Sequence, residues 1–133
     1  MEKITVALEN YLEAVFLNYA QGAGARISAI SRFLGVKKPS VVVAIRKLAK
    51  RGLASQEKYG YVFLTEPGKK QAQHINKKRG KIYDFLRSTT GINALQARYE
   101  ASGAAHYFSD MTVEKIAKVG VKKNLLGKNK KKK

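Results

Sequence analysis

Residues 26–51 constrain the fold of this chain most, because they carry two short helical patterns separated by a tight turn. The first pattern begins near Ser28, a good N-cap residue, and ends at Gly35, which suits a left-handed helix terminus. Pro39 opens the second pattern, where its missing N–H removes no hydrogen bond. The residues expected to be buried are Ile27, Ile30, Phe33, Leu34, Val41, Ile45, Leu48 and Ala49. This order of helix, short turn and helix is typical of a helix-turn-helix.

The outer side of the second helix is basic. Its cationic residues are Lys38, Arg46, Lys47, Lys50 and Arg51. A basic second helix favours DNA binding, because such helices enter the major groove beside phosphates. The alternative is an ordinary helical hairpin with solvated lysines.

Net charge points in the same direction. The 133 residues include 27 Lys and Arg against 9 Asp and Glu, a formal charge of +18. The last thirteen residues hold seven lysines and no acid, so the rest of the chain still carries +11. A basic body of this size indicates a polyanionic partner, most often nucleic acid, with a solubilising surface as the alternative.

Two further patterns flank the helix-turn-helix. Residues 4–20 have the apolar spacing of an amphipathic helix. After Gly52 the spacing changes to near 2, so residues 53–58 and 61–65 predict two strands of a hairpin. A hairpin directly after a helix-turn-helix is a wing, whose tip would offer Lys58 and Tyr59 to DNA. The predicted fold is therefore mainly α with a small β-hairpin, a winged helix-turn-helix over residues 1–66 followed by a helical region.

The rest of the chain predicts helices and a basic tail. Thr65 is placed to cap the first of these helices, and Ser109 or Asp110 the last. Residues 67–120 would form the helical region. The expected ranges are 66–88, 92–108 and 111–120 for the helices and 121–133 for a disordered lysine-rich tail.

Composition excludes several classes of protein. There is no cysteine, so disulfides, thiolate catalysis and zinc fingers are excluded. The glycines form no phosphate loop and no Ser-His-Asp set is evident, so we do not expect an enzyme. No apolar run approaches the roughly 20 residues of a membrane span, and the acidic N-terminus is unlike a signal peptide. We therefore expect a cytoplasmic protein without membrane contact.

Three blocks in order resemble the diphtheria-toxin-repressor family of iron- and manganese-dependent transcriptional repressors. They are LENYLEAV, RISAISRFLGVKKPSVVVAIRKLAKRGL and YGYVFLTEPGKK, and the resemblance continues more weakly to about residue 118. In length the chain is similar to the short two-domain form. The resemblance implies a homodimer that binds double-stranded DNA, with residues 67–120 as the dimerisation region and regulatory Mn²⁺ or Fe²⁺ between helices.

The metal ligands that the resemblance implies are largely replaced. Glu13 and His106 remain, and Asn10 would offer one oxygen. The other positions aligned with family ligands carry Arg79, Tyr83, Arg98, Ser102 and Ala105. A tight Mn²⁺ or Fe²⁺ site needs several carboxylate or imidazole donors, so we expect no metal cofactor and at most a degenerate site.

Arg79 suggests a specific replacement. Its permanent charge would lie where a cation sits in the family, and we hypothesise that it pairs with Glu13 in place of the metal. The alternative is that the site has decayed and Arg79 is solvated within the KKRGK run.

DNA would be read by the helix 39–51 and contacted by the wing 53–65. Val42 and Val43 replace polar family residues and would contact thymine methyls if exposed, or belong to the core if the helix is rotated. The candidate DNA-binding residues are Lys37, Lys38, Pro39, Ser40, Val42, Val43, Arg46, Lys47, Lys50, Lys58 and Tyr59.

Three functions are compatible with these patterns. The first is a DNA-binding transcriptional regulator, a repressor, that works independently of metal. The second is a non-specific or architectural nucleic-acid-binding protein, favoured by the lysine tail and the apolar start of the second helix. The third is a winged helix used for protein–protein contact.

Overall fold

The computed structural model describes residues 4–19, 24–55 and 59–131, with side chains described as far as Gly120. The chain divides into two compact units, Met1–His74 (unit 1) and Ile75–Lys133 (unit 2), and the division falls within α4 (Glu66–Phe85). Each unit has its own buried core. Within the described ranges, no helix is both long and apolar enough to span a bilayer.

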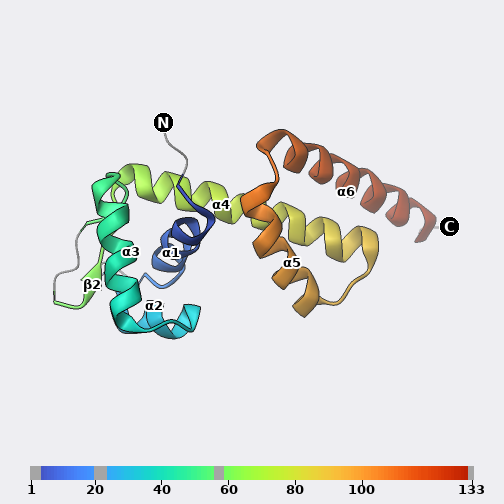
Figure 1. The fold of residues 1–133 in the computed structure, drawn as a ribbon. Coiled ribbons are helices and arrows are strands. Elements are labelled where there is room, and N and C mark those ends of the chain that lie inside the picture. The colour runs from blue at the N-terminus through green and yellow to red at the C-terminus, as the bar shows by residue number, and fades with distance from the viewer. Residues whose placement is uncertain (1–3, 20–23, 56–58, 132–133) are drawn as a thin grey trace. The chain divides into compact units, whose positions relative to one another are not determined.

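Unit 1 begins with the three helices α1 (Val6–Leu17), α2 (Ile27–Leu34) and α3 (Lys38–Lys50), which contact one another. Thr5 caps α1, because its hydroxyl accepts the backbone N–H of Leu8 at 3.2 Å. Gly35 ends α2 with a φ of 66°, a left-handed conformation that favours glycine. The turn from α2 to α3 is short (Figure 1), and Pro39 lies in the first turn of α3 as predicted. The predicted helix-turn-helix is therefore confirmed.

The sheet of unit 1 differs in part from the predicted hairpin. The two strands are β1 (Ala25–Arg26) and β2 (Tyr61–Val62), which pair antiparallel with Arg26 opposite Tyr61. The expected partner segment 53–58 pairs with 63–65 through an antiparallel bridge, Ala54 to Leu64, and the flanking Ser55 N–H and Thr65 N–H donate to the carbonyls of Phe63 and Leu53 at 2.8 and 3.1 Å. Residues 56–58 lie outside the described ranges. Strand β2 of the wing therefore pairs with Ala25–Arg26, the two residues before α2. The sequence analysis predicted no strand at those two residues.

This pairing also explains why Ser28 does not cap α2. The helix begins two residues earlier than a Ser28 cap requires, at Ile27, whose backbone N–H donates to the Gly60 carbonyl at 2.8 Å. An N-terminal donor is thereby satisfied by the wing rather than by a side chain. The predicted Ser28 cap is wrong for this reason.

The core of unit 1 contains most of the apolar residues predicted from helical spacing. Its fully buried large side chains are Leu12, Val15, Ile30, Val41, Ile45, Leu48 and Val62. Phe33 is an exception, with 55% of its surface exposed. It lies about 120° around the helix axis from Ile27, at the edge of the buried face of a short helix.

The start of α4 packs closely against the end of the helix-turn-helix. Thr65 caps α4 as predicted, accepting the backbone N–H of Gly68 at 3.1 Å and donating to the Gly52 carbonyl at 2.6 Å. A Cβ added to Gly68 would lie 1.8 Å from the Leu53 carbonyl oxygen. Only glycine fits at this contact without a shift of the backbone.

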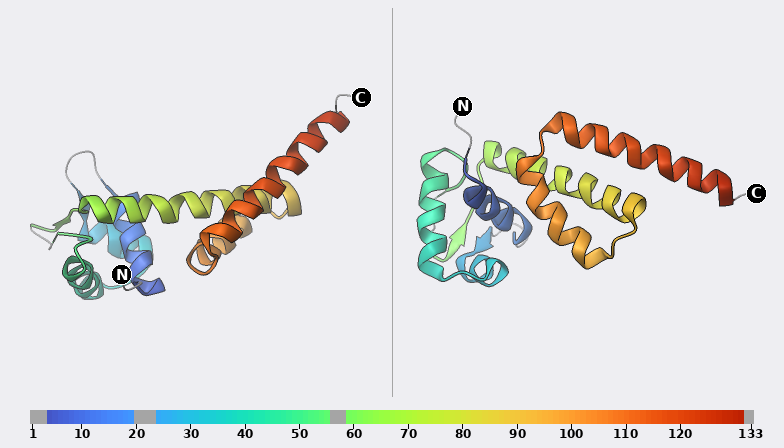
Figure 2. Two further views of the ribbon diagram at one scale, coloured as in Figure 1. Left: turned by 90° about the horizontal axis from the view of Figure 1, so that it is seen from above. Right: turned by 45° about the vertical axis from the view of Figure 1, so that its right-hand side comes forward.

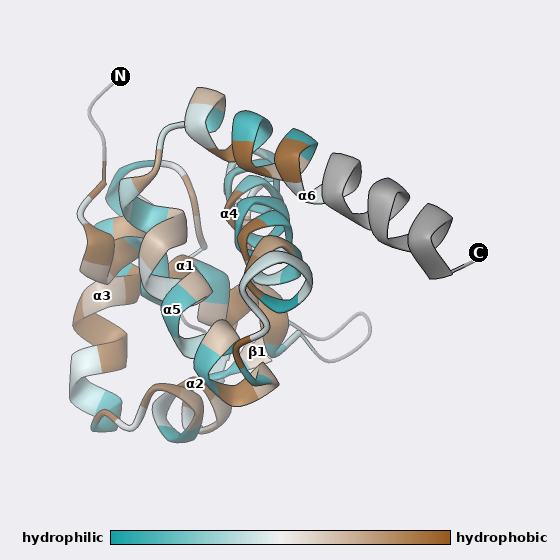
Figure 3. Cartoon of the chain, turned by 90° about the vertical axis from the view of Figure 1, so that its right-hand side faces the viewer, coloured by the Kyte–Doolittle hydropathy of each residue, from teal (hydrophilic) through white to brown (hydrophobic). Residues whose placement is uncertain are grey.

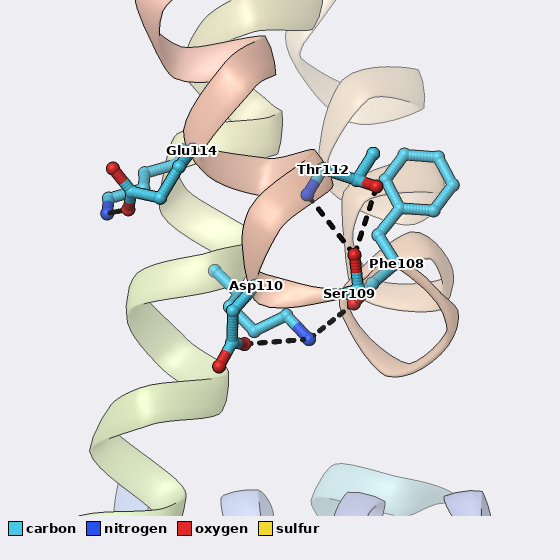
Figure 4. Close-up of polar contacts among 7 residues, drawn as sticks. Phe108, Ser109, Asp110, Thr112 and Glu114 are labelled. Atoms are coloured by element: carbon cyan, nitrogen blue, oxygen red, sulfur yellow. Dashed lines mark hydrogen bonds and ion pairs between the residues drawn. The ribbon is translucent and has the colours of Figure 1, made fainter.

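Unit 2 contains the second half of α4, the π-helical segment η1 (Leu86–Thr90), α5 (Ala94–Tyr107) and the start of α6 (Asp110–Lys131). Ser109 caps α6, as Figure 4 shows, because its hydroxyl accepts the Thr112 N–H at 3.2 Å. Two lysines of α4 tie it to the start of α6. Lys78 donates to the Phe108 carbonyl at 2.5 Å and lies 3.6 Å from the Asp110 carboxylate, and Lys81 pairs with Glu114.

The core of unit 2 is built from small residues. Ala97, Ala101 and Ala105 of α5 recur at a spacing of four and are all buried. Ala101 and Ala105 form one cluster with Ile82 and Val113. Small side chains at these positions allow α5 to pack closely against its neighbours. Much of α4, by contrast, is hydrophilic along its length (Figure 3).

The last helix extends beyond the range expected from the sequence. α6 runs as far as Lys131, and the disorder expected for the lysine-rich residues 121–133 stays a prediction. Both views in Figure 2 show α6 as one continuous helix. Lysine has good helix propensity and no proline interrupts the segment, which favours continuation of the helix.

Candidate nucleic-acid interface

The outer face of α3 collects exposed basic and small polar side chains. Exposed residues at its start are Lys37, Lys38, Pro39 and Ser40, and exposed residues further along are Val43, Arg46, Lys47 and Lys50. The helix contains no acidic residue. This face therefore presents cations along several turns of the helix, with the exposed side chains of Ser40 and Val43 among them.

The consecutive valines of α3 divide between the core and the surface. Val41 is fully buried, Val42 is half-buried and Val43 is 49% exposed. Ala44 is buried beside them. Val41 is therefore in the core as predicted, Val43 is exposed on the outer face of α3, and Val42 lies between the two alternatives.

The wing presents Tyr59 at its tip. Tyr59 is 88% exposed and has a φ of 57°, and Gly60 follows with a φ of 82°. Two successive left-handed residues are the conformation of the tight hairpin turns that match strand twist. A non-glycine residue in this region costs energy, and such positions cluster at functional sites. Lys58, the other predicted wing contact, lies outside the described residues.

Arg26 and Tyr61 connect the wing to the helix-turn-helix, and sequence reasoning missed them. The Arg26 Nε donates to the Tyr61 hydroxyl at 3.0 Å, and its guanidinium carbon lies 4.9 Å from the Tyr61 ring centroid. Cation–π contact of this kind stabilises exposed sites by roughly 0.5–1 kcal/mol. The available signal was an arginine before the first helix of the motif and a tyrosine in the wing, but their pairing depends on a register between distant segments.

The exposed side chains of α3 and of the wing are suited to binding double-stranded DNA. A helix with exposed cations and a short apolar strip can lie in a major groove, with the cations on phosphates and the strip on base edges. The exposed tyrosine of the wing lies in the same unit. These features define the class of winged helix-turn-helix DNA-binding regulators.

Comparison with known proteins agrees with this class. The family model described as "Iron dependent repressor, N-terminal DNA binding domain" matches residues 3–62. The HTH-type transcriptional regulator MntR of Geobacillus thermodenitrificans is 30% identical over 112 residues, which are 84% of this chain and 79% of that protein.

Solved structures share the fold. The crystal structure of IdeR from T. acidophilum is 26% identical with a TM-score of 0.71, covering 89% of this chain and 55% of its own. A hypothetical protein from Sulfolobus solfataricus, 22% identical with a TM-score of 0.64, covers 94% of this chain and 91% of its own and shows the fold alone. The chain thus spans about half of the IdeR structure and nearly all of the second.

The chain belongs to the iron-dependent repressor family, which includes the IdeR and MntR proteins, in a short form. It is a DNA-binding transcriptional repressor of that family and not an enzyme. The resemblance seen in the sequence blocks is confirmed.

The positions that the sequence resemblance aligns with family metal ligands carry few side chains able to hold a metal ion. Ala105 is 2% exposed and belongs to the apolar cluster of unit 2, and Tyr83 packs against that cluster. Asn10 is exposed on α1, Glu13 is buried in the same helix, and His106 is half-buried in α5. No group of three or more His, Cys, Asp or Glu side chains suited to a metal occurs among the residues described. Two ligand positions have become apolar packing, and too few donors remain for a tight Mn²⁺ or Fe²⁺ site.

Arg79 lies in the part of α4 that belongs to unit 2, and its guanidinium donates to the side-chain oxygen of Asn76. Glu13 belongs to unit 1. The Glu13–Arg79 ion pair stays a prediction from the sequence.

Proposed function

We propose that this chain represses transcription by selective binding to double-stranded DNA as a homodimer, without a bound metal ion. The observation that carries the proposal is the outer face of α3, with exposed Arg46, Lys47 and Lys50 around exposed Val43 and Ser40 and no acid in the helix. A solvated helix of a protein without a polyanionic partner would carry charges of both signs.

The residues of this face would contact different parts of the duplex. Val43 would contact a thymine methyl and Ser40 a base edge or phosphate, because both lie exposed near the start of α3. Arg46, Lys47 and Lys50 would contact phosphates, which gives affinity and salt dependence but little sequence choice. Selectivity would then be modest for the family and would depend partly on the shape of the duplex.

Metal independence is supported by the chemistry of the retained side chains. Glu13 and His106 are the only carboxylate and imidazole donors left at the aligned positions, and Ala105 is buried in an apolar cluster. The Glu13–Arg79 pair is a separate part of the proposal, and Arg79→Ala should then lower both stability and DNA affinity. An Arg79→Ala protein with unchanged stability and affinity would remove the pair but leave metal independence standing.

A homodimer is supported by large exposed apolar side chains in unit 2. Leu95 and Tyr99 are 78% and 82% exposed and lie one turn apart on α5. Such a pair on a helix surface would be stabilised by burial against a second copy. Sedimentation should report a dimer for the wild type and a monomer for a Leu95→Asp, Tyr99→Asp variant, and an unchanged dimer would place the interface elsewhere.

The DNA proposal is tested by fluorescence anisotropy in the presence of a chelator. A duplex obtained by selection from a random pool is compared with its scrambled counterpart at about physiological salt. We expect the selected duplex to bind at least tenfold more tightly and Val43→Ser to reduce that ratio more than it reduces binding to the scrambled duplex. No preference at any salt concentration would contradict a selective repressor.

A second function has one specific observation in its favour. Residues 121–133 hold seven lysines and no acid, which favours contact with phosphates independent of sequence. Equal and steeply salt-dependent binding to both duplexes would therefore assign the chain to the architectural nucleic-acid binders. Weak DNA binding with a shallow salt dependence would instead favour a winged helix that contacts a protein.

A further inference from the structure

A groove of about 770 Å³ lies between α1 and α3 in unit 1. Its volume is within the roughly 300–1,000 Å³ of small-molecule sites. The floor is apolar, with buried Leu8 and Ala44 and half-buried Tyr11. Val43, half exposed, forms part of the wall. A ligand with an apolar body would cover the exposed parts of Tyr11 and Val43.

The rim of the groove has one sign of charge. Lys47, Lys50 and Arg51 all line it and are exposed. None of the three forms an ion pair with an acid in the described part of the chain. No Asp or Glu lines the groove. The complementary ligand therefore combines an apolar body with an anionic head group.

We propose that this groove binds a small amphipathic organic anion, a carboxylate on an aliphatic or aromatic body, and that the bound anion displaces DNA. The carboxylate would lie at the Lys47, Lys50 and Arg51 rim, and the apolar body would lie on Leu8, Tyr11 and Val43. The tyrosine hydroxyl at the floor is an additional hydrogen-bond donor for the head group.

Competition with DNA follows from shared residues. Ser40, Val43 and Lys47 line the groove and also belong to the proposed DNA-reading face of α3. A ligand on them would block the approach of a duplex and neutralise cations that would otherwise meet phosphates. The signal for release of DNA would then be an organic acid. Only this consequence rests on the proposed function, because binding of the anion itself is measured without DNA.

Binding is tested by amide NMR titration of the full chain with decanoate below its micelle concentration. We expect saturable shift changes at groove residues, including Leu8, Tyr11 and Val43, and none of comparable size in unit 2. Acetate has the head group without the body, and decyltrimethylammonium has the body with the opposite charge. Both should bind at least tenfold more weakly, and equal binding by either probe would overturn the proposal.

Two variants locate the ligand. Lys47→Gln should weaken decanoate by about twofold to fivefold, as expected for one partly exposed charge pair. Arg46→Gln is the matched control, because it removes a cation from the same helix but does not line the groove. Ala7→Trp should block the groove from the α1 side, since Ala7 is an exposed lining residue. Equal weakening by Arg46→Gln, or undiminished binding to Ala7→Trp, would show a diffuse surface interaction and overturn the site.

Displacement of DNA completes the test. Decanoate should release a labelled duplex from the wild type and leave it bound to Ala7→Trp. Release from both proteins, or from neither while the groove is saturated, would overturn the competition. If the chain failed to bind DNA at all, the NMR titration would still decide the groove, so the two failures are distinguishable.

Discussion

Ala105→Glu returns a carboxylate to a position aligned with a family metal ligand, and we expect it to destabilise unit 2 instead of restoring a site. Ala105 is 2% exposed and lies in a cluster with Ile82, Ala101 and Val113. A carboxylate placed there loses its hydration and gains no opposite charge among these apolar neighbours. Burial in such surroundings raises the pKa of a carboxyl group by several units.

The loss of stability in Ala105→Glu depends on pH, and this dependence identifies its cause. If the pKa of the new carboxyl rises by about 2–3 units from an unfolded value near 4.3, the charged form costs about 3–4 kcal/mol at pH 7. The folded state then binds the extra proton more tightly than the unfolded state. Stability of the variant, relative to wild type, therefore falls as pH rises through the unfolded pKa towards the folded pKa. Overpacking adds about 1–3 kcal/mol at every pH.

Urea unfolding of both proteins at pH 4 and pH 7 measures the two contributions. We expect the loss of stability at pH 7 to exceed the loss at pH 4 by about 3 kcal/mol. Gln96→Glu is the matched control, since Gln96 is exposed on the same helix and its replacement should change stability by less than about 0.5 kcal/mol. An equal loss at both pH values, or recovery of stability on adding Mn²⁺, would refute the account of an apolar cluster at the former ligand position.

Three further predictions concern packing, phosphate contacts and a surface ion pair. Gly68→Ala should lower the free energy of unfolding by at least about 3 kcal/mol because its Cβ would overlap a backbone carbonyl, whereas Gly80→Ala, in open space within the same helix, should raise it by about 0.5–1 kcal/mol. Similar thermal shifts for the two variants would contradict the close approach. Arg46→Gln should weaken binding to selected and scrambled duplexes alike and reduce the slope of log K against log salt by about 1. A change confined to the selected duplex would instead assign Arg46 to base reading. The hydrogen bond and charge of Lys81 lower the pKa of Glu114, so their pair contributes stability above pH 4.5 that is lost as pH falls through the lowered pKa. Glu114→Gln should remove that acid-limb dependence from thermal unfolding while changing the neutral-pH melting temperature little, and an unchanged acid limb would exclude the pair.

Local patterns predicted the helices well because their signals lie within a few residues. The Gly35 terminus, the early proline of α3 and the Thr65 cap are each set by neighbours in sequence. The same reasoning could not find β1. Two residues carry no periodicity, and whether Ala25–Arg26 forms a strand depends on Tyr61–Val62, far along the chain.

The sequence identified the residues of the candidate DNA-binding face, but it could not predict the surface that they form. Helical spacing could not decide which valine of α3 is exposed, because Val42 and Val43 lie near the edge of the buried stripe. The apolar floor beneath Val43 also requires α1 to lie against α3, a tertiary contact. Likewise, the sequence showed that Ala105 cannot ligate a metal, and only the fold showed that it is packed in a core.

The central claim is most directly tested by measuring DNA affinity with and without metal. Anisotropy with the selected duplex is recorded in chelator and then in saturating Mn²⁺ at constant ionic strength, for the wild type and for His106→Ala. The account predicts that the two affinities of the wild type agree within about twofold and that His106→Ala does not change their ratio. A rise of tenfold or more with Mn²⁺ that disappears in His106→Ala would show a functional metal site and contradict the account.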